Sequence, residues 1–387
     1  MNWSAVLRAV RGIPMYSQRL GNATLFPQGT LEVDNALASE PTAVLVGYPY
    51  YQGRSKTYYL PRSTWAVRRK LYRLALPSIA LKLVDIGDIQ SRGQEASMLL
   101  EEVVREILRR GHRVLVVGGS QEAAHALYRA IAAQEIAFTY TLIDRKLDLL
   151  DAISAVEMPH RRFHRDMLMD GEVLVPVWGQ VLGLAWHWVS GVEEEILHAQ
   201  LRVPYLRLSE ILADPDLAEP FLRTADLITM DLGIVRGADA PAVLDPEPEG
   251  LPIEIAAKLM RFAGMGYRSF VLHIANYFPN RDTDGRTAAA LAVLYWYFLE
   301  GLINPQNDFP SPDRSNLDRY EVLMPESEPT SLTFYQHTLT GRWWMEIVPE
   351  GGMGRLFPCT RREYEEALRG EVPRLWYVLM MSLPTSP

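Results

Sequence analysis

The chain has 387 residues, 48% of them hydrophobic and 22% charged, which is typical of a globular protein with a sizeable core. That length allows one large α/β domain with an appendage, or two domains. The net charge of −8 argues against nucleic acid as the main partner, because phosphate binding needs a basic surplus or patch. The single cysteine, Cys359, excludes an internal disulfide framework and fits a reducing compartment, so we expect a cytoplasmic protein. No uninterrupted apolar run approaches 18 residues, so we expect no membrane span.

Apolar runs that end in turn residues alternate with amphipathic segments from Thr42 to Leu302. Such runs are typical of buried parallel strands, and amphipathic segments closed by glycine are typical of helices that cover them. The expected strands are residues 42–49, 82–89, 113–119, 136–144, 172–179 and 226–233, and residues 269–277, with a short strand and helix in 204–212. The expected helices are residues 63–76, 97–111, 120–134, 193–201, 253–266 and 287–302. This alternation predicts an α/β fold with a central parallel sheet.

The composition changes after Asn304, where proline, aspartate and serine become frequent. We therefore predict a lead-in over residues 1–41, an α/β domain over 42–305, and a linker with a C-terminal extension over 306–387. Within the extension, residues 331–349 alternate like a β-hairpin and residues 362–370 read as an acidic helix.

Trp343 and Trp344 are neighbours in the second strand of that hairpin. Adjacent strand residues face opposite sides, so one indole is expected to be exposed unless something covers it. This pair predicts contact with another protein or with a second copy of the chain.

The stretch FTYTLIDRKLDLLD (residues 138–151) begins as a strand and ends in alternating charge. If the strand persists, Asp144, Lys146 and Asp148 project from one face and Arg145 from the other. Two carboxylates at the end of a buried strand indicate a metal or proton-transfer site. The lysine between them indicates an ammonium in the place of a metal ion.

Four stretches, in this order along the chain, resemble the motifs of the ureohydrolase family, which includes arginase, agmatinase and formimidoylglutamase. They are GGSQE (118–122), DRKLD (144–148), TMDLGIVRGAD (229–239) and NYFPNRD (276–282). The resemblance covers residues 42–305 and is greatest to the formimidoylglutamase-like branch. It implies a three-layer α/β/α arginase-like fold with a central parallel sheet, to which this chain adds a small C-terminal β-hairpin and helix extension. It also implies two Mn²⁺ ions that activate water to attack a guanidinium, amidine or formimino carbon.

Carried over residue by residue, the resemblance gives a site with altered ligands. Asp144, Asp148 and Asp231 stand at positions of metal-binding aspartates. The remaining ligand positions hold Gln121, Lys146 and Gly233, and Asn276 stands where the family has a substrate-binding glutamate.

These substitutions lead to the hypothesis of a relic cleft without metal. A lysine would repel a cation by about 4 kcal/mol per unit charge at 4 Å, even at a dielectric constant near 20. We therefore expect Lys146 to pair with one of the three aspartates and expect no cofactor. If Mn²⁺ does bind, its ligands would be the three aspartates with Glu122 or His125, which share one helix face.

Three functional hypotheses follow. The first is a non-catalytic ureohydrolase-fold protein (a pseudoenzyme) that serves as a cytoplasmic binding or assembly component, as a homo-oligomer or with another protein. The alternative is an active formimidoylglutamase-like hydrolase of linear amidine C–N bonds with an atypical metal site. A second alternative is a sensor in which Arg145 and Lys146 hold an anionic metabolite.

Overall fold

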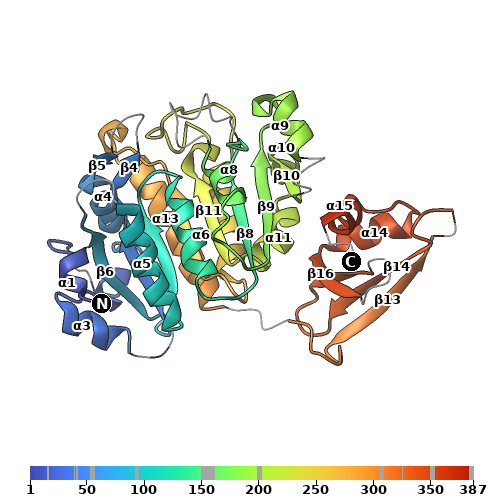
Figure 1. The fold of residues 1–387 in the computed structure, drawn as a ribbon, viewed down its shortest axis with the longest axis horizontal. Helices are drawn as coiled ribbons and strands as arrows, with labels where there is room; N and C mark the ends of the chain where they lie inside the picture. The colour runs from blue at the N-terminus through green and yellow to red at the C-terminus, as the bar shows by residue number, and fades with distance from the viewer. Residues whose placement is uncertain are drawn as a thin grey trace.

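A ten-stranded sheet forms the centre of the larger part of the molecule (Figure 1). The computed structural model describes residues 1–14, 17–38, 40, 42–52, 57–91, 96–149, 162–197, 203–304, 309–324, 326–348 and 354–382. The strands of this sheet are β1 (Leu7–Arg8), β2 (Thr24–Leu25), β3 (Ala43–Gly47), β6 (Leu83–Ile89), β7 (Arg113–Val117), β8 (Phe138–Ile143), β9 (Val177–Leu184), β10 (Tyr205–Arg207), β11 (Leu227–Asp231) and β12 (Val271–Ala275).

The strand order is β1-β6-β3-β7-β12-β11-β8-β9-β10, with β2 also paired to β6. Only β1 runs antiparallel to its neighbour among these described strands. The carboxyl ends of β7, β12, β11 and β8, which are neighbours in space, therefore meet at one edge of the sheet. Because the order of the strands reverses in this region, it is the place where ligands bind in open parallel sheets.

Helices cover both faces of the sheet and give the predicted three layers (Figure 1). They are α1 (Trp3–Val6), α2 (Leu20–Ala23), α3 (Thr30–Ala36), α4 (Pro61–Leu71), α5 (Ala96–Arg109), α6 (Ala123–Ala132), α8 (Phe163–Leu168), α9 (Gly191–Glu195), α10 (Leu208–Ala213), α11 (Glu219–Arg223), α12 (Ile253–Gly264) and α13 (Arg286–Leu302). Strand alternation divides the interior into two cores: Val44 and Val46 pack with α5, α6 and α8, whereas Ala43 and Leu45 pack with α4, α12 and α13. The three-layer α/β/α prediction is confirmed.

Two details differ from the sequence prediction. The strand expected at residues 172–179 is β9, which starts at Val177. Pro176 lacks the N–H that an interior strand needs, so pairing begins after it. The lead-in residues contribute β1 and β2 to the edge of the sheet at β6. Among the described residues, no helix combines the length and apolarity needed to span a membrane.

The C-terminal part is larger than the predicted hairpin and helix. It is a four-stranded antiparallel sheet packed against two helices, with its own core (Figure 1). Its elements are β13 (Leu317–Leu323), β14 (Ser331–His337), β15 (Trp343–Ile347), β16 (Arg355–Cys359), α14 (Arg361–Leu368) and α15 (Arg374–Ser382). The predicted hairpin corresponds to β14 and β15, which pair antiparallel.

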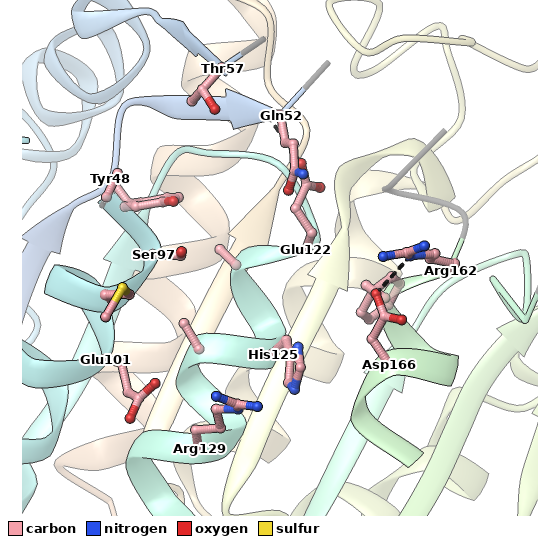
Figure 2. Close-up of a pocket in the computed structure, with 15 residues that line it drawn as sticks. Tyr48, Gln52, Thr57, Ser97, Glu101, Glu122, His125, Arg129, Arg162 and Asp166 are labelled. Atoms are coloured by element: carbon pink, nitrogen blue, oxygen red, sulfur yellow. Dashed lines mark hydrogen bonds and ion pairs between the residues drawn. The ribbon is translucent and has the colours of Figure 1, made fainter. Parts of the chain in front are cut away.

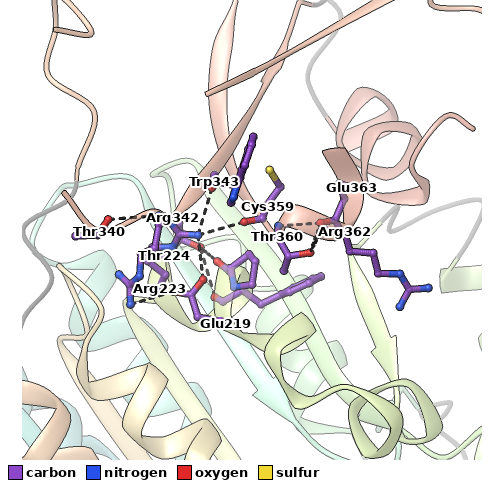
Figure 3. Close-up of polar contacts among 12 residues, drawn as sticks. Glu219, Arg223, Thr224, Thr340, Arg342, Trp343, Cys359, Thr360, Arg362 and Glu363 are labelled. Atoms are coloured by element: carbon purple, nitrogen blue, oxygen red, sulfur yellow. Dashed lines mark hydrogen bonds and ion pairs between the residues drawn. The ribbon is translucent and has the colours of Figure 1, made fainter. Parts of the chain in front are cut away.

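Arg223 at the end of α11 joins this C-terminal part to the larger part (Figure 3). Its Nη2 donates to the carbonyl oxygens of Trp343 and Cys359, both at 3.4 Å, and pairs with Glu219 at 2.9 Å. Arg342 of the C-terminal part reaches the same glutamate, with 3.1 Å between Nη2 and Oε1.

Both tryptophans of the hairpin are buried, contrary to the expectation that one would be exposed. The Trp343 side chain is 8% exposed and stacks on Tyr364 of α14, with ring centroids 4.7 Å apart. Trp344 is 1% exposed and lies beneath the guanidinium of Arg223, whose Cζ is 4.7 Å from the ring centroid. The element that covers Trp344 is thus α11 of the same chain. Contact with another protein remains a prediction, but Trp343 and Trp344 are too buried to form the contact surface.

Candidate active site

Four strand ends bring most of the predicted site residues to one cavity of about 40 Å³. Gln121 follows β7, Asp144 follows β8, Asp231 ends β11 and Asn276 follows β12. The ten residues that line the cavity are Gln121, Arg145, Lys146, Asp148, Asp231, Gly233, Val243, Leu244, Asp245 and Asn276. The turn that places Gln121 needs glycine, because Gly118 and Gly119 have φ of +89° and +81°.

Asp144 is buried beside this cavity and held by two donors. Its Oδ2 accepts a hydrogen bond from Gln121 Nε2 at 2.5 Å, and its Oδ1 accepts one from the backbone N–H of Lys146 at 2.9 Å. Burial raises the pKa of Asp144 well above its ordinary range, and the negative charge of Asp231 raises it further. A positive charge placed near Asp144 and Asp231 would therefore be stabilised by both carboxylates.

Lys146 does not supply that charge, contrary to the ion-pair hypothesis. Its Nζ lies 4.3 Å from the ring centroid of Trp188, and no ion pair joins it to Asp144, Asp148 or Asp231 in the described part of the chain. The reason is that β8 ends at Ile143, so strand alternation does not extend to Lys146. Trp188, in a short 3₁₀ helix after β9, was not predicted as a site residue, although the run WHW at Trp186–Trp188 could have indicated an aromatic wall.

Arg145 lines the same cavity instead of the opposite face. Its side chain is 7% exposed, and its Nη2 donates to the backbone oxygen of Asp245 at 2.6 Å. Its Nη1 is buried and has no hydrogen-bond partner among the described residues. A Cβ at Gly233 would lie 3.6 Å from Arg145 Nη2 and 3.1 Å from Asp231 Oδ1. The guanidinium thus lies beside the position where the family has its second aspartate.

Two of the five described non-glycine residues with positive φ line this cavity. Asp148 has φ of 50° and Asn276 has φ of 69°, in the left-handed region that costs non-glycine residues energy. Such conformations persist where the surrounding structure enforces them, commonly at ligand sites. Asn276 also donates to Gln121 through Nδ2 and Oε1 at 3.5 Å, which continues the hydrogen-bonded chain to Asp144.

Glu122 and His125 line another cavity than Asp148 and Asp231, so the expectation that either completes the ligand set of the aspartates stays a prediction. They lie on one face of α6 and line a separate pocket of about 380 Å³ between α5, α6 and α8 (Figure 2). His125 Nε2 contacts Asp170 Oδ2 at 2.7 Å. Glu122 Oε1 accepts hydrogen bonds from Ser120 Oγ at 2.6 Å and from Gln52 N at 3.1 Å. Two cavities therefore flank the start of α6.

Burial raises the pKa of Glu122 from its ordinary value of 4.5 to about 7. The native state then holds this proton more tightly than the unfolded chain, so the carboxyl lowers stability as pH rises from 4.5 to 7. We expect Glu122→Gln to be more stable than wild type at pH 8, by on the order of 2 kcal/mol, with the difference vanishing below the unfolded pKa. Urea unfolding at several pH values measures this. A pH-independent difference would contradict it.

The fold and the site together define the class of protein. The sequence profile of the arginase family matches residues 42–300, and the chain belongs to this family. Formimidoylglutamase of Paraburkholderia xenovorans is 28% identical over 276 residues, covering 64% of this chain and 82% of that protein. Formimidoylglutamase of Ralstonia nicotianae is 27% identical over 257 residues, covering 61% and 77%.

Solved structures agree on the fold. Trypanosoma cruzi formiminoglutamase with two Mn²⁺ ions gives a TM-score of 0.60 at 18% identity, covering 69% of this chain and 95% of that chain. Formimidoylglutamase of Bacillus subtilis gives 0.63 at 16% identity, covering 78% and 98%.

These comparisons correct two sequence-based expectations. The prediction of a non-catalytic component is wrong, because the relatives with the same matched region are named as enzymes. The prediction of no cofactor is wrong as well, because a neighbour of this fold holds Mn²⁺. The physical reason for both corrections is the position of Lys146, whose ammonium lies against the ring of Trp188 and forms no ion pair with Asp144 or Asp231 within the described residues.

Proposed function

We propose that the protein is a hydrolase of linear amidine C–N bonds that acts on formimino compounds. The observation that carries this proposal is the convergence of Asp148 and Asp231 on one cavity, with Asp144 buried beside it, at the carboxyl ends of β8 and β11. Their positions correspond to the metal-binding aspartates of the family, and the named relatives are formimidoylglutamases.

The donors present fit one Mn²⁺ ion by their chemistry. Asp144, Asp148 and Asp231 supply hard carboxylate oxygens, which suit Mn²⁺. Burial and then repulsion from Asp231 raise the pKa of Asp144, and a dication would offset both effects. No three His, Cys, Asp or Glu side chains already form a metal-binding cluster in the described ranges, so the fit rests on donor type. A bound Mn²⁺ would lower the pKa of a water and polarise the amidine.

The chain's own groups orient the reactants. The N–H of Gly233 donates to Asp231 Oδ1 at 2.7 Å, and Gln121 with the Lys146 N–H fixes Asp144, so both carboxylates are held before substrate arrives. A cavity of about 40 Å³ admits a flat formimino group with little other water. Water adds to the formimino carbon, the C–N bond to the amine breaks, and formamide and the protonated amine leave.

Arg145 is suited to bind a carboxylate of the substrate, because its buried Nη1 has no partner among the described residues. We expect Arg145→Met to raise the KM for N-formimidoyl-glutamate about tenfold to hundredfold, with a smaller effect on kcat. Steady-state kinetics measure this. Formamidine, which has no carboxylate, is the matched control and is expected to show no change in KM. An equal change for both substrates would contradict the assignment.

The test of the proposed function is turnover after loading with Mn²⁺. Ions per chain are quantified by mass spectrometry, and formamide released from N-formimidoyl-glutamate is followed by NMR, with a chelator-treated sample as reference. Turnover that follows Mn²⁺ content supports the proposal. A chain that binds Mn²⁺ but hydrolyses neither formimino nor guanidino compounds overturns it.

Two further expectations belong to this proposal. The one cysteine is a buried free thiol, which is consistent with the cytoplasm. Self-association, usual in the family, stays a prediction, and size-exclusion chromatography with light scattering would test it.

A further inference from the structure

The pocket between α5, α6 and α8 is distinct from the proposed active site. It has a volume of about 380 Å³, within the range of small-molecule sites, whereas the strand-end cavity has about 40 Å³. The two share no lining residue. Figure 2 shows Glu122, His125 and Arg129 along α6, with Tyr48, Ser97 and Glu101 on one side and Arg162 and Asp166 on the other.

Nearly every charged group in this pocket already has a partner of opposite charge. Glu101 pairs with Arg105, and Arg162 pairs with Asp166 at 3.0 Å. Arg129 and His125 both contact Asp170, at 2.6 Å and 2.7 Å. Because these guanidinium groups and the imidazole already contact carboxylates, they do not create a site for an anion.

Glu122 is the exception. It makes no ion pair within the described residues, and its Oε2 is buried without a hydrogen-bond partner there. A buried carboxylate oxygen without a donor is costly, and an ammonium or amidinium would supply both the donor and the charge. The apolar residues that line the pocket include Ala126 and the exposed Met98, on which a short hydrocarbon stem would pack.

We propose that this pocket binds a small organic monocation, a primary ammonium or amidinium on a short apolar stem, with Glu122 as its counter-ion. The site is separate from the proposed active site, and the inference does not depend on which reaction occurs there.

Titration calorimetry of the full chain at pH 8 with n-butylammonium chloride tests the proposal. We expect one ion per chain, with affinity about tenfold to hundredfold lower in Glu122→Gln, which keeps the acceptor for Ser120 and Gln52. Ala126→Met fills the apolar part of the pocket and is expected to weaken binding as well. n-Butanol has the same hydrocarbon chain as n-butylammonium but carries no charge, and it is expected to bind at least tenfold more weakly.

Asp231→Asn is the matched control for the other cavity and is expected to bind n-butylammonium as wild type does. Equal affinity in Glu122→Gln, or no heat of binding by the wild type at millimolar concentrations, overturns the proposal. Loss of binding in Asp231→Asn also overturns it, because the cation would then lie at the strand ends. These outcomes are measured by binding alone and not by hydrolase activity. The test of the pocket therefore stays valid even if the protein proves to lack the proposed hydrolase activity.

Discussion

Asp231→Asn is expected to lower kcat/KM for a formimino substrate by about a thousandfold. A metal-polarised water contributes several kcal/mol to transition-state stabilisation, and losing one of three carboxylates removes much of it. Asparagine keeps the acceptor for the Gly233 N–H, so the fold is expected to survive. The measurement is kcat/KM together with Mn²⁺ content per chain.

Asp239→Asn is the matched control for that variant. Asp239 lies on the same segment and pairs with Arg236 at 2.6 Å, but it does not line the cavity. Its activity is expected to stay within about twofold of wild type, because asparagine keeps an acceptor for Arg236 and the side chain lies outside the cavity. If Asp231→Asn keeps a tenth or more of wild-type activity, the strand-end cavity is not the active site.

Arg68→Met is expected to cost about 3–5 kcal/mol of folding free energy. Arg68 is 2% exposed, and its Nε and Nη2 donate to Asp85 at 2.7 Å and 2.9 Å, while Nη1 contacts Asp88. Asp85 is fully buried and also accepts from the Tyr72 hydroxyl. Without the guanidinium, Asp85 would be a buried charge with no counter-ion, which is far costlier than the loss of a hydrogen bond.

Arg105→Met is the matched control, because its pair with Glu101 lies on the surface of α5. Its effect on urea unfolding is expected to be about 0.5 kcal/mol or less. The double variant Arg68→Met, Asp85→Leu is expected to recover part of the loss, since it removes the unpaired charge. A double variant that is less stable by the sum of both single losses would show that the cost arises from packing.

The sheet and its helices follow from the sequence because apolar runs and glycine turns are local signals. Val44 and Val46 point to one core and Leu45 to the other, as strand alternation requires. The predicted start of β9 differs from the structure for a local reason as well. Pro176 has no backbone N–H to donate, so β9 begins at Val177 and not at residue 172.

The direction of side chains after a strand end could not be predicted in this way. Alternation stops at Ile143, so Arg145 joins the cavity that Lys146 was expected to fill, and Lys146 contacts Trp188, which lies more than 40 residues further on. Glu122 and His125 do share a helix face, but only the packing of α5 and α8 shows that this face borders another pocket. Likewise Arg223, far away in sequence, decides the burial of Trp344.

The left-handed backbone at Asp148 and Asn276 has an implication for how the protein tolerates change. Glycine adopts these φ values at no steric cost, so Asp148→Gly or Asn276→Gly would relieve local strain while deleting a side chain from the cavity. Glycine also has more conformational freedom in the unfolded chain, which offsets part of that gain. Aspartate and asparagine tolerate the left-handed region better than most other non-glycine residues, so these two positions keep a polar side chain in the cavity at a small cost in strain.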